Sequence, residues 1–427
     1  MARKGFFYGW ILIPVVWVCY GFGISPAYYT WGAFASSLIE DLDFSRADIG
    51  GVFGLFTFLY SGVGPLVGFS MTRWGIRATM TGGFITSALG LFLMSRADSL
   101  LDCYIAFALL GGSGIGFATI IPCQTLGQNW FLKHRALAIA IIFTAGGIVG
   151  KIVTRYDTYI LEHYDWRTGW LVLAGVSGCL AIIAALLIRD TPEQLGQMRD
   201  GASPDDGPAA PGTALASADS MDTWTAKQAL RTWQFALLVV CGVAYAVPWG
   251  VTVSHMTLHF MDIGFSREDA IPLLGTMALI SIAGRMTGML GDYVPPTIVL
   301  AVALVLEGLG CGGLLIAETK PMAYVCIAMI GLGFGTAYIS IPVVFSHFFG
   351  RQAFGMTSGV RIFVTGIFNG LGPWVTGMIV DKTGSYSIPF AALMVLGLCG
   401  AVAAAVCRHP GLPPSDSAHV PADDENA

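Results

Sequence analysis

Residues 44–48 read Phe-Ser-Arg-Ala-Asp, and residues 265–269 read Phe-Ser-Arg-Glu-Asp, at an offset of 221 positions. Nearly the same offset relates three further pairs of residues that bend or pack helices: Gly64 and Gly284, Gly68 and Gly288, and Pro122 and Pro342. One such match can arise by chance, but several at nearly one offset indicate a duplicated unit. The fold is therefore expected to have two related halves.

The duplicated unit is strongly apolar. Of the 427 residues, 55% are hydrophobic and 11% are charged, and the mean hydropathy is +0.69. Soluble proteins carry about 25% charged residues, so the composition excludes a soluble enzyme, a secreted disulfide-rich protein and a nucleic-acid-binding protein. In a lipid bilayer, long apolar stretches form helices because their backbone groups must pair internally. Twelve such spans are predicted, at residues 8–34, 49–71, 77–95, 102–128, 137–159, 167–188, 233–260, 270–291, 297–317, 322–346, 355–379 and 387–406.

A polar segment divides the twelve predicted spans into two groups of six. Residues 189–232 include a run rich in Pro, Gly, Ser and Asp, which is typical of a flexible linker. We therefore expect an N-terminal bundle at residues 1–188, a C-terminal bundle at 233–406 and a disordered cytoplasmic tail at 407–427. Loops on the side of the termini hold twice as many Lys and Arg residues as loops on the other side. This asymmetry places both termini in the cytoplasm of a multi-pass inner-membrane protein.

The segment that follows the second predicted span reads Gly-Phe-Ser-Met-Thr-Arg-Trp-Gly-Ile-Arg over residues 68–77. It resembles the loop motif Gly-x-x-x-Asp-Arg-x-Gly-x-Arg of the major facilitator superfamily, with Thr72 in place of the usual Asp. The resemblance implies a gating loop, whose expected residues are Gly68, Arg73, Gly75 and Arg77, with Asp292 in the related loop of the second half.

Within that superfamily, the sequence resembles the branch of monocarboxylate porters and oxalate/formate antiporters. The segments that carry this resemblance are residues 8–10, 29–34, 44–48, 165–167, 262–266 and 377–386. The resemblance implies an all-α membrane protein with twelve transmembrane helices in two pseudo-symmetric six-helix bundles. It also implies alternating-access transport of a small organic carboxylate, with no cofactor and with a monomer as the functional unit.

Four cationic residues lie inside predicted spans, where a charge costs at least ~2.5–3.5 kcal/mol: Lys151, Arg155, Arg285 and Arg361. The repeat counterpart of Arg285 is Pro65, so this charge does not belong to the shared template. The resemblance implies that Arg285 binds the substrate carboxylate, which a guanidinium can hold through two parallel hydrogen bonds; a buried ion pair is the alternative. Arg361 is expected to contact substrate or to pair at a gate, and Lys151 to bind a second anionic group.

Uncharged polar residues also lie in spans that line the pathway in the resembling family. Tyr29, Tyr338, Thr119 and Asn369 are expected either to cradle the organic part of the substrate or to bridge helices. The glycine runs at residues 111–116 and 331–335 have no preceding strand. We therefore expect these runs to pack helices rather than to bind a nucleotide.

Few deep-membrane groups can carry a proton. His255 is expected to hydrogen-bond substrate, to carry a proton or to be a buried polar residue, and a zinc site with His259 lacks a third ligand. Asp157, near the end of the fifth span, is a second proton candidate. Glu307 falls on the ninth span, which is a scaffold helix in the resembling family.

These features predict a secondary transporter that moves a small organic carboxylate, such as a monocarboxylate or an acid from aromatic catabolism, together with protons. The alternatives are an exchanger that moves one anion against another and a carboxylate sensor that transports nothing. The sequence contains no motif for ATP binding or metal-dependent catalysis. Efflux of cationic drugs is disfavoured because most of the charges inside the spans are positive.

Overall fold

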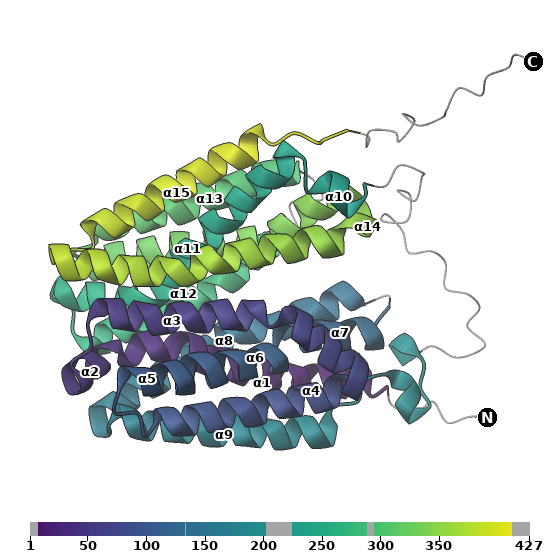
Figure 1. Ribbon diagram of the computed structural model, residues 1–427, viewed down its shortest axis with the longest axis horizontal. Helices are drawn as coiled ribbons and strands as arrows, with labels where there is room; N and C mark the ends of the chain where they lie inside the picture. Colours follow the sequence, from purple (N-terminus) through teal and green to yellow (C-terminus); the bar gives the residue numbers. More distant parts are fainter. Residues whose placement is uncertain (1–6, 133, 202–223, 288–293, 412–427) are drawn as a thin grey trace, which may run out of the picture.

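The computed structural model describes residues 7–132, 134–201, 224–287 and 294–411, and these ranges fold into helices joined by short loops. Figure 1 shows two bundles of long helices lying against each other, one from each half of the chain. The first helix begins and the last helix ends at the same end of the molecule, which we call the terminal end (Figure 1). The other end is called the opposite end.

The first half contains two long stretches in which the helix type changes and four simpler helices. Its elements are α1 (Gly9–Ser25), η1 (Pro26–Thr30), α2 (Trp31–Leu42), α3 (Arg46–Gly62), α4 (Gly64–Met94), α5 (Leu100–Cys103), η2 (Tyr104–Gly112), α6 (Ser113–Ala118), α7 (Ile120–Trp130), α8 (Arg135–His163) and α9 (Trp166–Leu187). The segments η1 and η2 are π-helical. Such wider turns inside helices are frequent at functional sites.

The second half follows two short 3-10 turns, η3 (Pro192–Leu195) and η4 (Arg199–Gly201), and residues 202–223 of the linker, which are outside the described ranges. Its elements are α10 (Ala226–Ala229), α11 (Trp233–Asp262), α12 (Arg267–Thr287), α13 (Pro296–Gly313), η6 (Leu314–Ile316), α14 (Lys320–Thr383) and α15 (Ser387–Val406). The helix α14 is long enough to contain two membrane spans.

Eleven described helical stretches are long and apolar enough to cross a membrane. The expected second span is not among them because α3 has 17 residues and a new helix, α4, begins at Gly64. Two glycines with positive φ separate consecutive spans, Gly75 at 86° within α4 and Gly350 at 68° within α14. Glycine adopts this left-handed conformation without steric cost. With α3 and the start of α4 taken as the second span, the helices follow the twelve predicted spans in order.

The two glycine runs pack helices in the same way in both halves. A Cβ added at Gly114 would lie 2.5 Å from the Ser87 nitrogen on α4, and one added at Gly333 would lie 2.6 Å from the Glu307 nitrogen on α13. The glycines two residues before and after each of these face α3 in the first half and α12 in the second. The expectation that the runs pack helices is therefore confirmed, and the matching contacts follow the offset found in the sequence.

The start of the linker is folded against the terminal end of the first half. Asp190 accepts hydrogen bonds from the backbone N–H groups of Ile76 and Arg77, at 3.0 and 2.8 Å. It thereby caps the helix that restarts after Gly75, where unpaired N–H groups favour a carboxylate. The predicted flexible run and disordered tail fall largely on residues 202–223 and 412–427, which lie outside the described residues.

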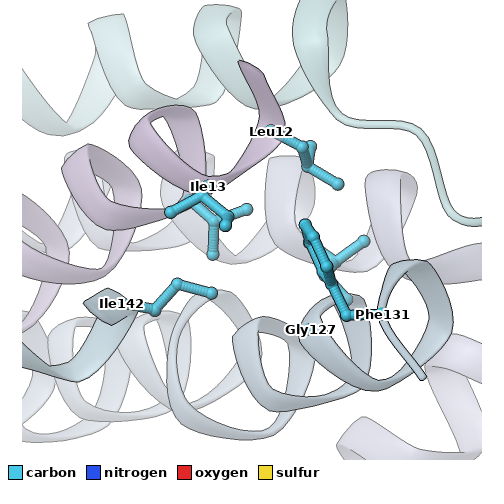
Figure 2. Close-up of a pocket in the computed structure, with 7 residues that line it drawn as sticks. Leu12, Ile13, Gly127, Phe131 and Ile142 are labelled. Atoms are coloured by element: carbon cyan, nitrogen blue, oxygen red, sulfur yellow. The ribbon is translucent and has the colours of Figure 1, made fainter. Parts of the chain in front are cut away.

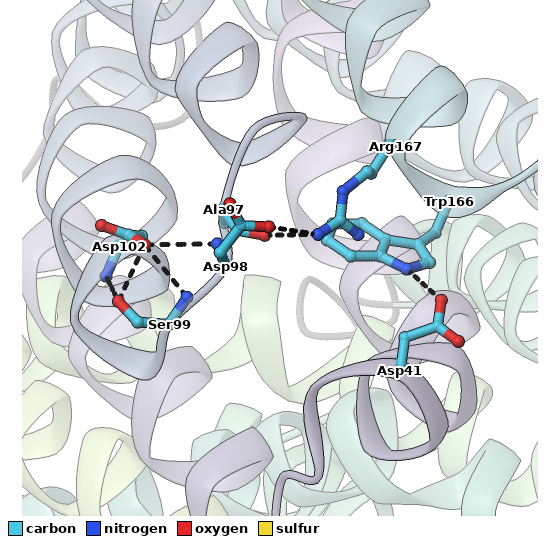
Figure 3. A network of polar contacts seen from close by, with 7 residues as sticks. All are labelled: Asp41, Ala97, Asp98, Ser99, Asp102, Trp166 and Arg167. Carbon is cyan, nitrogen blue, oxygen red and sulfur yellow. Dashed lines mark hydrogen bonds and ion pairs between the residues drawn. The ribbon is translucent and has the colours of Figure 1, made fainter.

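A polar network braces the opposite end of the first half (Figure 3). Arg167, at the start of α9, donates to the Asp98 carboxylate at 2.6 Å and to the Ala97 carbonyl at 3.0 Å. Its guanidinium also lies 4.2 Å from the centroid of the Trp166 ring, and the Trp166 indole donates to Asp41 at 2.8 Å. These contacts join α9 to α2 and to the loop before α5.

Candidate substrate site between the two halves

Arg285 lies where α12 of the second half faces α8 of the first. Its Nη1 donates to the Phe143 carbonyl at 2.7 Å, and its guanidinium carbon lies 5.0 Å from the centroid of the Tyr338 ring on α14. The Nε atom is buried and has no hydrogen-bond partner in the described part of the chain. Within the described ranges no carboxylate forms an ion pair with Arg285. Arg285 is thus a partly buried cation that contacts both halves and keeps donors free for an anion.

Tyrosine side chains from both halves lie in the neighbourhood of this arginine. Tyr20 on α1, Tyr29 on η1 and Tyr338 are close enough to interact electrostatically with its charge. The three phenols offer hydroxyl groups and flat apolar surfaces to the organic part of a ligand. Tyr29 and Tyr338 were expected from the sequence, whereas Tyr20 was not. A tyrosine inside an apolar helix has no sequence signal that distinguishes it from a packing residue.

An aromatic wall extends from Tyr338 into the second half. The Phe334 ring lies 6.0 Å from Tyr338 and stacks on Trp249 of α11, with centroids 3.8 Å apart and an interplanar angle of 13°. Tyr245, one turn before Trp249, lies 5.7 Å from the same Phe334 ring. Residues 334–338 of α14 therefore connect the interior of the second half with Arg285.

Arg361 begins a polar stripe on the second part of α14. Arg361, Thr365 and Asn369 are four residues apart, so they share one helix face, and this face packs against α11. Each carries a buried atom without a hydrogen-bond partner in the described part of the chain: Arg361 Nε, Thr365 Oγ1 and Asn369 Oδ1. Arg361 is only 6% exposed and, like Arg285, interacts electrostatically with Tyr338. The stripe thus adds a second cation and two polar groups near the first.

Lys151 makes a different contact between the halves. Its Nζ donates to the Thr276 hydroxyl at 2.5 Å and to the Pro272 carbonyl at 3.2 Å, both on α12. The helices cross closely here, because an added Cβ on Gly275 would overlap Thr154. Lys151 therefore joins α8 to α12 in this structure, and its expected contact with a substrate anion stays a prediction.

Asp157 and Thr119 lie inside the first half. Asp157 is fully buried, and its two carboxylate oxygens accept from the Thr30 hydroxyl at 2.9 and 3.1 Å. Thr30 belongs to the same π-helical turn as Tyr29, so Asp157 is linked to the segment that contributes to the site. Thr119 is buried at the break between α6 and α7, where its hydroxyl donates to the Ile115 carbonyl at 2.7 Å.

His255 belongs to a cluster that lies toward the opposite end. Its Nε2 donates to the Pro373 carbonyl at 2.9 Å, and its Nδ1 lies 3.4 Å from the Tyr386 hydroxyl. The guanidinium carbon of Arg46 lies 5.6 Å from the centroid of the Tyr386 ring. His255 is therefore connected, through Tyr386, to the contacts that close the opposite end.

We call these contacts, formed by Glu40, Arg46, Asp262, Arg267 and Asp381, the opposite-end latch. Arg46 of the first half pairs with Asp262 at 2.6 Å, and Arg267 of the second half pairs with Glu40 at 3.0 Å. Asp381 accepts from the backbone N–H groups of residues 46 and 47, at 3.0 and 2.8 Å. Arg46 and Arg267 occupy the same position in the two copies of the repeated motif. Each copy therefore contributes an arginine that pairs with an acid of the other half. In the sequence the motif indicated duplication, and nothing in its residues predicted this role.

The expected gating loop lies at the terminal end. Arg73 and Arg77 are exposed, and Gly75 forms the positive-φ turn described above. Thr72 donates to the carbonyl of Gly68, in its own helix, at 3.2 Å. A carboxylate in this region comes from Asp190 and not from position 72, where the motif usually has Asp and this chain has Thr. Asp292 lies outside the described residues, so the pairing expected for it stays a prediction.

Two cavities lie outside the cluster around Arg285. Figure 2 shows the first, an apolar pocket of about 10 Å³ between α1, α7 and α8 that is lined by Leu12, Ile13 and Phe131 among others. Such a volume holds about one water molecule, so this pocket is too small for an organic acid. The second cavity has a volume of about 460 Å³ and lies at the opposite end of the molecule, between the end of α8 and the start of α12. Its lining residues include His163 and Arg267.

Comparisons with known proteins agree with this architecture. The family model described as Major Facilitator Superfamily matches residues 16–359 and 286–426. Monocarboxylate transporter 12-B of Danio rerio is 30% identical over 337 residues, covering 73% of this chain and 69% of that protein. Monocarboxylate transporter 2 of Mesocricetus auratus is 21% identical over 393 residues, covering 90% of this chain and 81% of that protein.

Solved structures show the same fold at low sequence identity. The nucleoside transporter NupG (D323A mutant) is 13% identical with a TM-score of 0.72, covering 93% of this chain and 99% of that one. A D-xylose-proton symporter is 14% identical with a TM-score of 0.70, covering 95% and 98%. The chain is therefore a multi-pass membrane protein and a secondary transporter rather than an enzyme. It belongs to the major facilitator superfamily, in the branch of the monocarboxylate porters.

Proposed function

We propose that this transporter carries a small organic carboxylate and that Arg285 binds the carboxylate group. The observation that supports this most is the position of Arg285, which contacts the Phe143 carbonyl of one half and the Tyr338 ring of the other without an acidic partner in the described ranges. Arg285 is partly buried, and a cation taken out of water without a counter-ion is unfavourable, so an anionic ligand would stabilise it. Because the ligand would then touch both halves, its binding would depend on how they are arranged.

We further propose that transport is coupled to protons, with Asp157 and His255 as candidate carriers. Asp157 is fully buried and is held by a neutral hydroxyl group. His255 is connected through Tyr386 to the opposite-end latch. In this proposal the terminal end faces the cytoplasm of a cell with an inner membrane, the linker lies on that side, and one chain is the functional unit.

Anion exchange is the second candidate, and Arg361 is the observation that favours it. Arg361 is buried, and its Nε has no hydrogen-bond partner in the described part of the chain. Two cations near Tyr338, Arg285 and Arg361, would suit a doubly charged substrate anion. The exchanger would move this anion in one direction and a singly charged anion in the other. Proton-driven accumulation in sealed vesicles distinguishes symport from this alternative, because an exchanger needs an internal anion instead of a pH gradient.

The experiment begins with purified protein in detergent and a panel of L-lactate, pyruvate, oxalate, succinate and benzoate. A ligand at about 100 times its dissociation constant adds ~2.7 kcal/mol to stability, which raises the melting temperature. The stabilising acid is then supplied in labelled form to proteoliposomes. Wild-type protein is expected to take it up, and Arg285→Ala is expected to lose uptake while keeping a folded elution profile.

Arg96→Gln is the matched control, because Arg96 is an exposed arginine at the end of α4. It should transport like the wild-type protein. Undiminished uptake by Arg285→Ala, or stabilisation of the wild-type protein by cationic compounds alone, would contradict the proposal.

A further inference from the structure

Glu307 is a fully buried carboxyl group that the proposed function does not use. It lies on α13, is 0% exposed, and neither of its carboxylate oxygens has a hydrogen-bond partner among the described residues. No lysine, arginine or histidine among the described residues forms an ion pair with it. An ionised carboxylate in such surroundings is strongly unfavourable. The neutral, protonated form of Glu307 is therefore favoured in this arrangement of the helices.

The described residues around Glu307 bring no compensating charge to it. The titratable group next to it is the Cys311 thiol, one turn further along α13, and α11 contributes the Thr252 hydroxyl beside that thiol. The facing residue on α14 is Gly333, whose missing side chain lets α14 approach the Glu307 backbone. On its other side α13 packs against α15 at Gly308, where the contacts are with the neutral residues Met394 and Gly397.

The segment of α14 that contacts Glu307 also carries the aromatic wall of the substrate site. Gly333 lies against Glu307, and its neighbour Phe334 stacks on Trp249 at 3.8 Å. One turn later, Tyr338 lies beneath the guanidinium of Arg285 at 5.0 Å. A movement of this segment during alternating access would therefore change the environment of Glu307 and of Arg285 together.

We infer that Glu307 is the proton-binding site through which transport is coupled to a pH gradient. Protonated Glu307 fits the closed packing of α11, α13 and α14 seen here, whereas ionised Glu307 requires water or a cation and hence a different packing. A proton that binds one state better than another shifts the equilibrium between the states. This inference rests on the proposed proton coupling, and it assigns the carrier to a residue other than Asp157 and His255.

Two variants separate the carriers. Glu307→Gln mimics the protonated acid with a neutral side chain of similar shape, and Asp157→Asn does the same in the first half. Glu318→Gln is the matched control, because Glu318 is an exposed glutamate beyond the end of the same helix. All are reconstituted in proteoliposomes with L-lactate, succinate and benzoate as labelled probes.

The first measurement is accumulation driven by a pH gradient, compared with exchange of labelled for unlabelled acid without a gradient. A one-unit gradient corresponds to 1.36 kcal/mol, so coupling to one proton gives about tenfold accumulation. Glu307→Gln should lose this accumulation but exchange within about twofold of the wild-type rate, whereas Glu318→Gln should retain both. If Glu307→Gln still accumulates the probes like the wild-type protein, or if Asp157→Asn alone loses accumulation, the inference is overturned.

The second measurement needs no substrate. Infrared difference spectra recorded between acidic and alkaline pH should show the carbonyl band of a protonated carboxylic acid that disappears in Glu307→Gln and persists in Glu318→Gln. An unchanged band in Glu307→Gln would overturn the inference. A wild-type protein that accumulates none of the probes would instead count against the proposed proton coupling, while the infrared band would still report whether Glu307 carries a proton.

Discussion

Gly114 of the first half packs against Ser87, and Gly333 of the second half packs against Glu307 in the equivalent place. A similar difference occurs at the eighth span, where Arg285 has Pro65 as its counterpart in the second span. The small residues that let helices cross closely are shared by both halves, but the charged groups inside the membrane differ. The two halves thus share the glycines that let helices cross, whereas Arg285 and Glu307 have uncharged counterparts, Pro65 and Ser87, in the first half.

The largest expected effect concerns the shared scaffold. Gly114→Leu and Gly333→Leu should each abolish the yield of folded protein. Backbone atoms of the neighbouring helix occupy the space that the leucine side chain needs, and overpacking costs ~1–3 kcal/mol or more. Yield and elution profile in detergent measure this. Gly82→Leu is the control, since no atom lies within 4 Å of a Cβ added there. A folded Gly333→Leu protein with the stability of Gly82→Leu would show that the two crossings are not equivalent.

The next effect tests whether the second half binds anions through more than one cation. Arg361→Gln should weaken binding about tenfold, because a hydrogen bond to a charged group contributes ~1.5–3 kcal/mol. The loss should be greater for succinate than for L-lactate if Arg361 meets a second carboxylate. Titration calorimetry on purified protein measures both ligands, with the exposed residue Arg408 changed to Gln as the control. If Arg361→Gln and Arg408→Gln bind each ligand with equal affinity, Arg361 does not contribute to ligand binding.

A third prediction concerns the latch, to which both halves contribute. Asp381 caps the start of α3 through two backbone N–H groups, so Asp381→Ala should favour opening of the opposite end by ~1.5–3 kcal/mol. The ion pair between Arg267 and Glu40 is partly exposed, and removing it through Arg267→Gln should cost less, at ~0–1 kcal/mol.

Distances between spin labels at positions 43 and 318 measure this opening, after the two exposed cysteines, Cys179 and Cys399, have been replaced by Ser. The distance distribution should shift to longer values in Asp381→Ala and shift less in Arg267→Gln. An unchanged distribution in Asp381→Ala would show that the latch does not hold the opposite end closed.

The smallest expected effect sharpens the comparison of Ser87 with Glu307. Ser87→Ala removes a small hydroxyl from the equivalent crossing, and we expect exchange and proton-driven accumulation to stay within about twofold of wild type, since ordinary substitutions away from charges cost little. The same vesicle assay used for Glu307→Gln measures both rates. Loss of proton-driven accumulation in Ser87→Ala would indicate that the crossing itself, rather than the carboxyl group, carries the coupling.

Much of the fold follows from the sequence because lipid imposes strict limits on the backbone. Apolar length predicted the spans, and the repeated motif together with three residue pairs at nearly the same offset predicted the two halves. What the sequence could not provide is the packing partner of each polar residue. Lys151 and Arg285 both appear as cations in apolar helices. Lys151 is held by a hydroxyl and a carbonyl of the facing helix, whereas Arg285 donates to one carbonyl there and its Nε has no partner in the described part of the chain.

Glu307 shows the same limit more clearly. Its place on the ninth span suggested a scaffold residue, and no local pattern distinguishes a partnered glutamate from a partnerless one. Only the three-dimensional contacts of α11, α13 and α14 reveal that both oxygens lack a partner within the described ranges. Likewise, the role of Asp190 at the restart of α4 depends on a residue more than a hundred positions away along the chain.

The most direct test of the central claim compares an acid with its uncharged amide. Dissociation constants of L-lactate and lactamide, and of benzoate and benzamide, are measured by calorimetry for the wild-type protein and for Arg285→Gln. A buried charge pair that loses one partner costs ~2–5 kcal/mol, so the wild-type protein should prefer the acid that it binds by at least about thirtyfold, and Arg285→Gln should lose this preference. If Arg285→Gln still prefers the acid as strongly as the wild-type protein does, Arg285 is not the carboxylate-binding residue.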